Sequence, residues 1–117
     1  MTASAIQELR INVDGSEIPV SHAGTQGEAV ILIHGAGDDR REWRETISTL
    51  SAECRVYAPD LIGFGESPRG NVTYNMRMFR EFIVGLMDEL GIQSAALIGH
   101  SLGGRISLKV ASATPER

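Results

Sequence analysis

The sequence contains few cysteines, no long apolar run and no cluster of basic residues. Cys54 is its one cysteine, so no disulfide can form within the chain, and we expect a reducing, cytoplasmic setting. No apolar run approaches membrane-spanning length, and residues 1–10 lack the basic and apolar segments of a secretory signal. Lys and Arg are not clustered and the net charge is −4, which argues against a nucleic-acid partner.

Patterns typical of metal and nucleotide sites are also missing. Three scattered histidines and a single cysteine do not have the spacing of metal ligands, so we expect no metal and no cofactor. Gly35-Ala36-Gly37 begins like Gly-x-Gly-x-x-Gly, but position 40 is Arg, and Asp38-Asp39 would repel a pyrophosphate. The Gly-x-Gly at 63–65 runs into Pro68 instead of a third glycine. A nucleotide-binding α/β protein is therefore disfavoured.

What the sequence does contain is an alternation of short apolar runs and amphipathic helical patterns. With 42% hydrophobic and 22% charged residues, 117 residues suffice for one folded domain. Asp14-Gly15, between alternating stretches at 6–13 and 17–22, predicts an N-terminal β-hairpin. Further strands are predicted at 29–33, 54–58 and 95–98, and helices from about Trp43 to Leu50, over 75–90 and from the last strand to about 113. We expect an α/β fold, with a mostly parallel sheet and helices on both faces.

The motif Gly-x-Ser-x-Gly at residues 99–103 dominates the sequence. It follows an apolar run and precedes a helical pattern, and strand, sharp turn and helix in this order are the context of a nucleophile elbow. Gly99 and Gly103 leave room for a strained turn, so Ser101 would stand clear of the sheet at a helix N-terminus. The apolar positions of the helix are taken to be Ile106, Leu108, Val110 and Ala111. The alternative is a chance match in which Ser101 only caps a helix.

Two further motifs follow predicted strands. His34-Gly35 follows the run at 29–33, and Asp60 follows the strand at 54–58. Ligands of such sheets bind beyond the carboxyl ends of the strands, so we expect His34, Asp60 and Ser101 to share one rim. The loop from Asp60 to Thr73, which holds Gly63, Gly65, Pro68 and Gly70, is long enough to suspect a function.

With these three motifs in this order, the chain resembles an α/β-hydrolase of the esterase-like branch, from about Ile11 to Arg117. The resemblance implies Ser101 as the nucleophile. It implies the backbone amides of Ala36 and Leu102 as the oxyanion hole. The remaining motif residues would support this site, namely His34, Gly35, Gly37, Asp60, Gly99, His100 and Gly103. His34 is expected to be structural rather than a general base, Asp60 to fix its loop, and His100 to fill space beside the sheet.

The acid and the histidine that follow the serine in this family are missing from the sequence. The 16 residues after Ser101 contain no Asp and no His, and Glu116 is their one carboxylic side chain. We therefore interpret residues 1–117 as the N-terminal part of a single α/β-hydrolase domain, inactive by itself. The strand at 95–98 would keep one unpaired edge, which favours self-association.

The function implied is hydrolysis of an ester-like carbonyl of a small molecule through an acyl-enzyme on Ser101. A serine nucleophile disfavours dehalogenases and epoxide hydrolases, whose nucleophile is Asp. It leaves esterases, lipase-like enzymes, carbon–carbon bond hydrolases, acyltransferases and perhydrolases. The alternative is a non-catalytic module that binds a small molecule at the same rim. No nucleic acid or membrane partner is expected.

Overall fold

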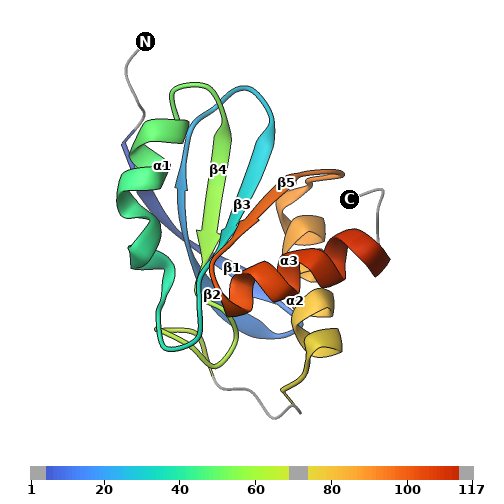
Figure 1. The fold of residues 1–117 in the computed structure, drawn as a ribbon. Helices are drawn as coiled ribbons and strands as arrows, with labels where there is room; N and C mark the ends of the chain where they lie inside the picture. The colour runs from blue at the N-terminus through green and yellow to red at the C-terminus, as the bar shows by residue number, and fades with distance from the viewer. Residues whose placement is uncertain (1–4, 69–73, 114–117) are drawn as a thin grey trace.

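The computed structural model describes residues 5–68 and 74–113 (Figure 1). In chain order its elements are β1 (Gln7–Val13), β2 (Ser16–Ala23), β3 (Ala29–Ile33), the 3₁₀ turn η1 (Arg40–Trp43), α1 (Arg44–Leu50), β4 (Arg55–Pro59), α2 (Met76–Leu90), β5 (Ala96–Gly99) and α3 (Leu102–Ala113). Expectations that fall on residues 1–4, on 69–73 (Gly70 and Thr73 of the long loop) and on 114–117 lie outside the described residues. No helix in the described ranges is both long and apolar enough to span a bilayer.

The five strands form one sheet in the order β1-β2-β4-β3-β5. β4, β3 and β5 run parallel to one another, as the sequence predicts for strands joined by helical crossovers. β1 and β2 form the predicted hairpin, turning at Asp14 (φ 52°) and Gly15 (φ 84°), and β2 joins β4 antiparallel. The predicted α/β fold is confirmed, with a mixed sheet because the hairpin adds antiparallel pairs to the parallel part.

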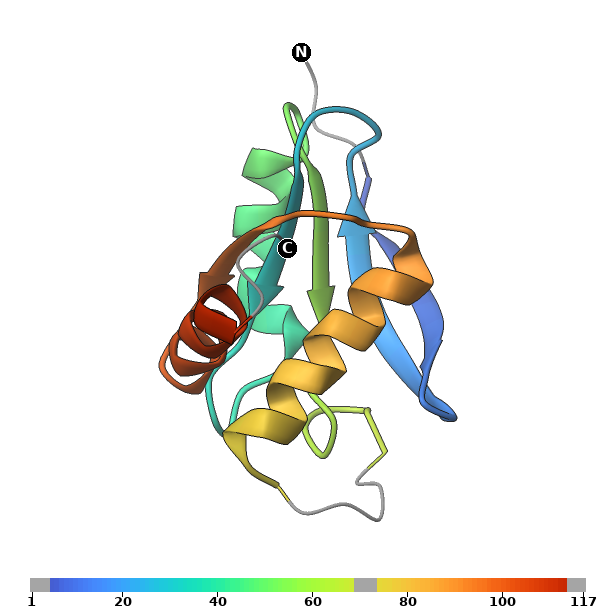
Figure 2. The ribbon, with the colours of Figure 1, turned by 90° about the vertical axis from the view of Figure 1, so that its right-hand side faces the viewer.

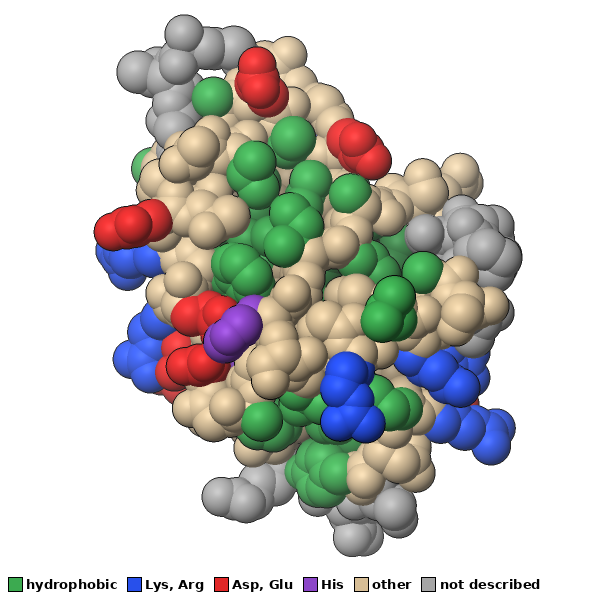
Figure 3. All heavy atoms as spheres, in the orientation of Figure 1, with side chains coloured by type: hydrophobic (Ala, Val, Ile, Leu, Met, Phe, Trp, Pro, Cys, Tyr) green, Lys and Arg blue, Asp and Glu red, His purple; other side chains and the backbone are tan. Residues whose placement is uncertain are grey.

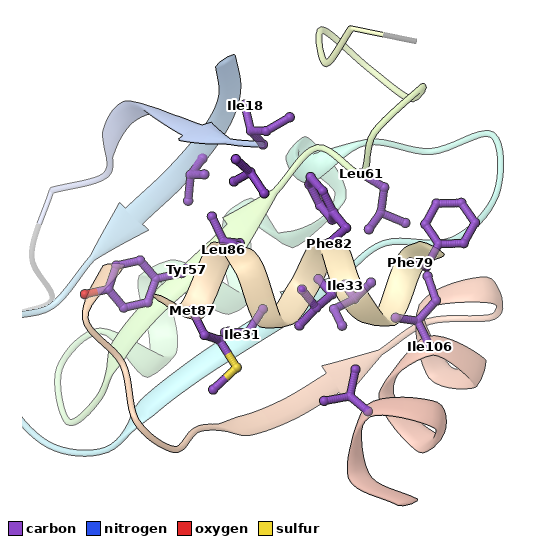
Figure 4. Packing of buried hydrophobic residues seen from close by; sticks show 14 of the residues in the cluster. Ile18, Ile31, Ile33, Tyr57, Leu61, Phe79, Phe82, Leu86, Met87 and Ile106 are labelled. Carbon is purple, nitrogen blue, oxygen red and sulfur yellow. The ribbon is translucent and has the colours of Figure 1, made fainter. Parts of the chain in front are cut away.

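β3 is the central strand, and all five of its residues are buried. Helices cover both faces of the sheet around it: α1 packs on one side, and α2 and α3 on the other (Figures 1 and 2). Successive side chains of a strand point to opposite faces, so Ile31 and Ile33 enter the core beneath α2 and α3 (Figure 4). Val30 and Leu32 join the smaller core beneath α1. This two-sided burial explains the unbroken apolar run.

The long helix α2 has the bounds that its sequence predicts. The side chain of Asn75 accepts a hydrogen bond from the Met78 amide (2.8 Å), and Gly91 ends the helix in the left-handed conformation (φ 71°). Its apolar face meets the sheet through Phe79, Phe82, Ile83, Leu86 and Met87 (Figure 4). These five side chains anchor α2 to the sheet.

The helix α3 differs from expectation in which of its residues are buried. Ile106 and Val110, one helical turn apart, are fully buried. Leu108 lies on the opposite side of the helix and is 73% exposed, and Ala111 is exposed as well, so neither packs in the core. β5 lies at the edge of the sheet and pairs only with β3 among the described strands, which leaves Ile98 40% exposed. The expected open edge is therefore present in this part of the chain.

Candidate active site

Ser101 stands at the turn between β5 and α3 and has a left-handed backbone, with φ of 57°. This conformation is uncommon outside glycine and stores strain that surrounding structure must hold. The turn is tied to β3 by a hydrogen bond from the His100 amide to the Ile33 carbonyl (3.0 Å), and the Gly103 amide donates to the His100 carbonyl (2.9 Å). The predicted strand–turn–helix around Ser101 is confirmed, and Ser101 is exposed.

The two glycines that flank the serine are required by close backbone packing. A Cβ on Gly99 would overlap the backbone of Gly103, and a Cβ on Gly103 would overlap the carbonyl oxygen of Ile33. The neighbouring Gly104 is less crowded, because a Cβ there would lie 3.6 Å from the nearest atom, the Gly99 carbonyl oxygen. The start of α3 therefore rests directly on the ends of β3 and β5.

The loop that follows β3, residues 34–39, lies against the serine turn. Ile33 pairs with Gly99, so the two strands end side by side. A Cβ on Gly35 would lie 2.9 Å from His100 Nδ1 and 3.1 Å from the His100 carbonyl oxygen. Ala36 follows in this loop and is exposed, while Leu102 begins α3. The two residues named as oxyanion-hole donors thus come from segments that touch one another next to Ser101.

His34 is fully buried and uses both ring nitrogens within the protein. Nε2 accepts the Leu61 amide (3.0 Å), so the proton resides on Nδ1, which donates to the Gly35 carbonyl (2.8 Å). The imidazole joins the loop after β3 to the loop after β4. Because neither nitrogen is free to take a proton from a serine, the geometry fits a structural role and not a general base.

Asp60 is likewise buried and is engaged by the protein itself. Its Oδ1 accepts the Arg40 amide (2.7 Å), and its Oδ2 accepts the Glu66 amide (2.8 Å) and the Arg40 guanidinium. The Ser67 hydroxyl donates to the Asp60 carbonyl oxygen (2.6 Å). The carboxylate thus holds the first part of the loop that begins at residue 60, which is the role that the resemblance implies.

Arg40 is the centre of an ion-pair network that the sequence pattern did not reveal. Besides Asp60, its guanidinium contacts Glu8 (2.9 Å) and Glu66 (3.0 Å). Burial acts against the charge, but the hydrogen bonds to these carboxylates and the charge of Asp60 raise the pKa of Arg40 above its ordinary value. Partial burial acts to raise the pKa of Glu8, but the hydrogen bonds from Arg40 and Ser21 lower this pKa below its ordinary value.

His100 does not fill space beside the sheet, and this expectation is wrong. Its side chain is 57% exposed. The ring packs against the Gly35 backbone, where a Cβ would lie 2.9 Å from Nδ1. There Nδ1 lies 3.0 Å from Glu42 Oε1 and 3.8 Å from Asp38 Oδ2, while the other Glu42 oxygen accepts the Gly35 amide (3.3 Å). On the face drawn in Figure 3 a histidine lies against a group of acidic side chains. Sequence spacing could not indicate this cluster, because its members come from two distant segments.

Comparison with known proteins agrees with this geometry. A model of the alpha/beta hydrolase fold matches residues 28–117. The dihydrolipoyllysine-residue acetyltransferase component of the acetoin cleaving system of Pseudomonas putida is 40% identical over 94 residues, which are 80% of this chain and 25% of that protein. The 2-hydroxymuconate semialdehyde hydrolase of Pseudomonas sp. strain CF600 is 38% identical over 100 residues, covering 82% of this chain and 35% of that protein.

A solved structure is also similar to this chain. Epoxide hydrolase A from Mycobacterium thermoresistibile superposes with a TM-score of 0.89 at 30% identity, over 97% of this chain and 37% of its own. The chain thus spans between 25% and 37% of the length of these three proteins. The family model covers most of the chain, which is sufficient to assign the family. The chain belongs to the alpha/beta hydrolase fold family.

Proposed function

We propose that Ser101 is the nucleophile of a hydrolase that cleaves an ester-like carbonyl of a small molecule through an acyl-enzyme. The observation that carries the proposal is the left-handed backbone of Ser101 between β5 and α3 (φ 57°). Such strain persists where surrounding structure enforces it, and it is concentrated at active sites. Ser101 is exposed and directly precedes α3, and the free backbone amides of a helix N-terminus favour negative charge.

The amides of Ala36 and Leu102 are the proposed oxyanion hole. Attack on a carbonyl places negative charge on its oxygen, and each amide aimed at that oxygen lowers the barrier by about 3 kcal/mol. Ala36 is exposed between Gly35 and the left-handed Gly37 (φ 83°), so little side-chain bulk keeps a substrate from its backbone. Leu102 directly follows the serine.

None of the described histidines forms a hydrogen bond to the Ser101 hydroxyl, as a general base would. His34 has both nitrogens engaged, His22 makes a hydrogen bond to the Val56 carbonyl through Nδ1 (3.0 Å), and His100 Nδ1 contacts Glu42. A serine hydroxyl is a weak nucleophile until a base takes its proton. We therefore expect this chain alone to hold the nucleophile and the oxyanion donors without completing a catalytic cycle.

A fluorophosphonate probe and a p-nitrophenyl ester test the proposal on the chain itself. We expect no ester turnover above the Ser101→Ala variant. Added imidazole can act as a soluble base, so we expect it to speed phosphonylation at Ser101, mapped by mass spectrometry. Ser48→Ala, which changes another exposed serine, should label like the wild type.

Two outcomes would contradict parts of the proposal. Ser101-dependent multiple turnover without imidazole would show that a base is present in the chain. Labelling that shows no preference for Ser101 over Ser48, even with imidazole, would remove the nucleophile assignment. It would favour the alternative, a non-catalytic module that binds a small molecule at the same rim.

A further inference from the structure

Three potential metal ligands converge where the loop after β3 meets the serine turn. Asp38 and Glu42 come from the segment that follows β3, and His100 follows β5. One ligand atom from each of the three lies within 4.8 Å of the other two. Because β3 and β5 end in register, at Ile33 and Gly99, this convergence is set by the sheet and not by a flexible tail.

The distances between these atoms suit a small ion. Tetrahedral zinc with bonds of about 2.0–2.2 Å needs ligand atoms about 3.3–3.6 Å apart. His100 Nδ1 lies 3.0 Å from Glu42 Oε1 and 3.8 Å from Asp38 Oδ2, which brackets that spacing. Small side-chain rotations of exposed groups would bring all three atoms to a common centre.

The surroundings also fit a metal site. The second oxygen of Glu42 accepts the Gly35 amide (3.3 Å), and such outer hydrogen bonds orient ligating carboxylates. The side chains of Asp38 and His100 are 49% and 57% exposed, so an ion can enter from solvent and keep water ligands. The group carries two carboxylates, whose negative charge favours a cation.

We propose that Asp38, Glu42 and His100 form a site for a divalent transition-metal ion of the zinc class, with water completing the coordination. An imidazole nitrogen with carboxylate oxygens suits Zn²⁺, whereas Ca²⁺ and Mg²⁺ prefer oxygen ligands alone. The bound ion would cross-link the loop that carries Ala36 to the turn that carries Ser101. This site is separate from the proposed hydrolysis, and the inference does not depend on it.

Isothermal titration of the chelator-treated chain with ZnCl₂ tests the proposal. All measurements use a Cys54→Ser background, because the free thiol of Cys54 is itself a zinc ligand. We expect one ion per chain, and affinity at least tenfold weaker in each of the variants Asp38→Asn, Glu42→Gln and His100→Ala. None of the three side chains belongs to the hydrophobic core, so circular dichroism should show an unchanged fold.

Two matched controls make the result specific. Glu45→Gln removes an exposed carboxylate from α1, and His22→Gln removes the other accessible histidine; both should bind zinc like the background chain. X-ray absorption of the zinc-loaded chain should show nitrogen and oxygen neighbours at about 2.0–2.2 Å. The proposal is overturned if the three ligand variants bind zinc as the background does, or if Mg²⁺ and Ca²⁺ bind as tightly as Zn²⁺.

Discussion

Gly103 packs so closely on Ile33 that a side chain at Gly103 would overlap the Ile33 carbonyl oxygen. This contact joins the first turn of α3 to the end of the central strand. It also fixes the backbone on both sides of the serine turn, because the Gly103 amide bonds to the His100 carbonyl. The contact is between backbone atoms, so no side-chain rotation can relieve the overlap.

We expect Gly103→Ala to lower the free energy of unfolding by about 3 kcal/mol, the upper part of the range for overpacking. Gly104→Ala is the matched control, because a Cβ there meets its nearest atom at 3.6 Å. Alanine also has the better helix propensity, so that variant should gain about 0.5–1 kcal/mol. Urea unfolding followed by circular dichroism measures both, and equal effects would contradict the packing argument.

His34→Ala separates a structural histidine from a catalytic one. The substitution leaves the Leu61 amide and the Gly35 carbonyl without their buried partner. Each orphaned group costs about 1–3 kcal/mol, so we expect a clear loss of stability and faster hydrogen exchange at Leu61. His100→Ala, at an exposed site, should change the free energy of unfolding by less than about 0.5 kcal/mol. Similar small effects in both variants would refute the structural role.

Asp60→Ala should be among the most destabilising single substitutions in the chain. It leaves the Arg40 guanidinium without its fully buried partner, and breaking a buried pair from one side costs about 3–5 kcal/mol. Glu66→Gln is the comparison, since the carboxylate of Glu66 is 60% exposed and exposed pairs contribute about 0–1 kcal/mol. Chemical unfolding of both variants in low and high salt gives the test. Comparable losses in the free energy of unfolding would contradict the larger contribution of Asp60.

Asp39 gives a prediction on acid stability. Its side chain accepts hydrogen bonds from the Arg41 side chain (2.7 Å) and amide (2.9 Å), which hold the pKa of Asp39 at about 2, below the ordinary 3.8. A pKa lowered by folding adds stability above the unfolded value and loses it as the pH falls through the folded value.

The Asp39→Asn variant isolates this charge, because asparagine is as good a helix cap as aspartate. We expect wild type to be more stable than Asp39→Asn above pH of about 4 and the difference to shrink toward about pH 2. Urea unfolding at a series of pH values measures the difference. A gap that stays constant down to pH 2 would show that the charge does not contribute.

Leu108 and Ile98 lead us to expect concentration-dependent self-association. Both are exposed apolar side chains, at 73% and 40%, and Ile98 belongs to the edge strand β5. Unpaired strand edges are templates for other chains. Leu108→Glu combined with Ile98→Thr should shift sedimentation toward the monomer, whereas Gln7→Glu, at an exposed position of the opposite edge strand β1, is expected to shift it less. Monomeric wild-type protein at all concentrations would refute this expectation.

Local sequence patterns predicted the parts of the fold whose cause is local. The run at 29–33 gave β3 with its bounds unchanged, because burial on both faces demands an apolar residue at every position. The predicted range 75–90 agrees with α2, since its caps at Asn75 and Gly91 depend on the residues at the cap itself. A strained turn at Ser101 was predicted from Gly99 and Gly103, and the structure shows that the strain is a left-handed backbone.

The features that were missed depend on residues distant in the sequence. Arg40 meets Glu8, Asp60 and Glu66 through the folded sheet, and no periodic pattern links these positions. The position of His100 also depends on a distant segment. Because Gly35 has no Cβ, the His100 ring packs against its backbone and contacts Glu42. Such contacts follow from strand order, which the sequence alone did not provide.

The order of the strands has a consequence for synthesis on the ribosome. β3 pairs with β4 and β5, and both are translated after it. β3 can pair with β4 once residue 59 has left the exit tunnel, but its other edge has no partner until residue 99 follows, although the hairpin of β1 and β2 can close long before. The strand with the most apolar sequence thus keeps one edge unpaired while α2 is synthesised, and slow codons between β4 and β5 would lengthen that interval.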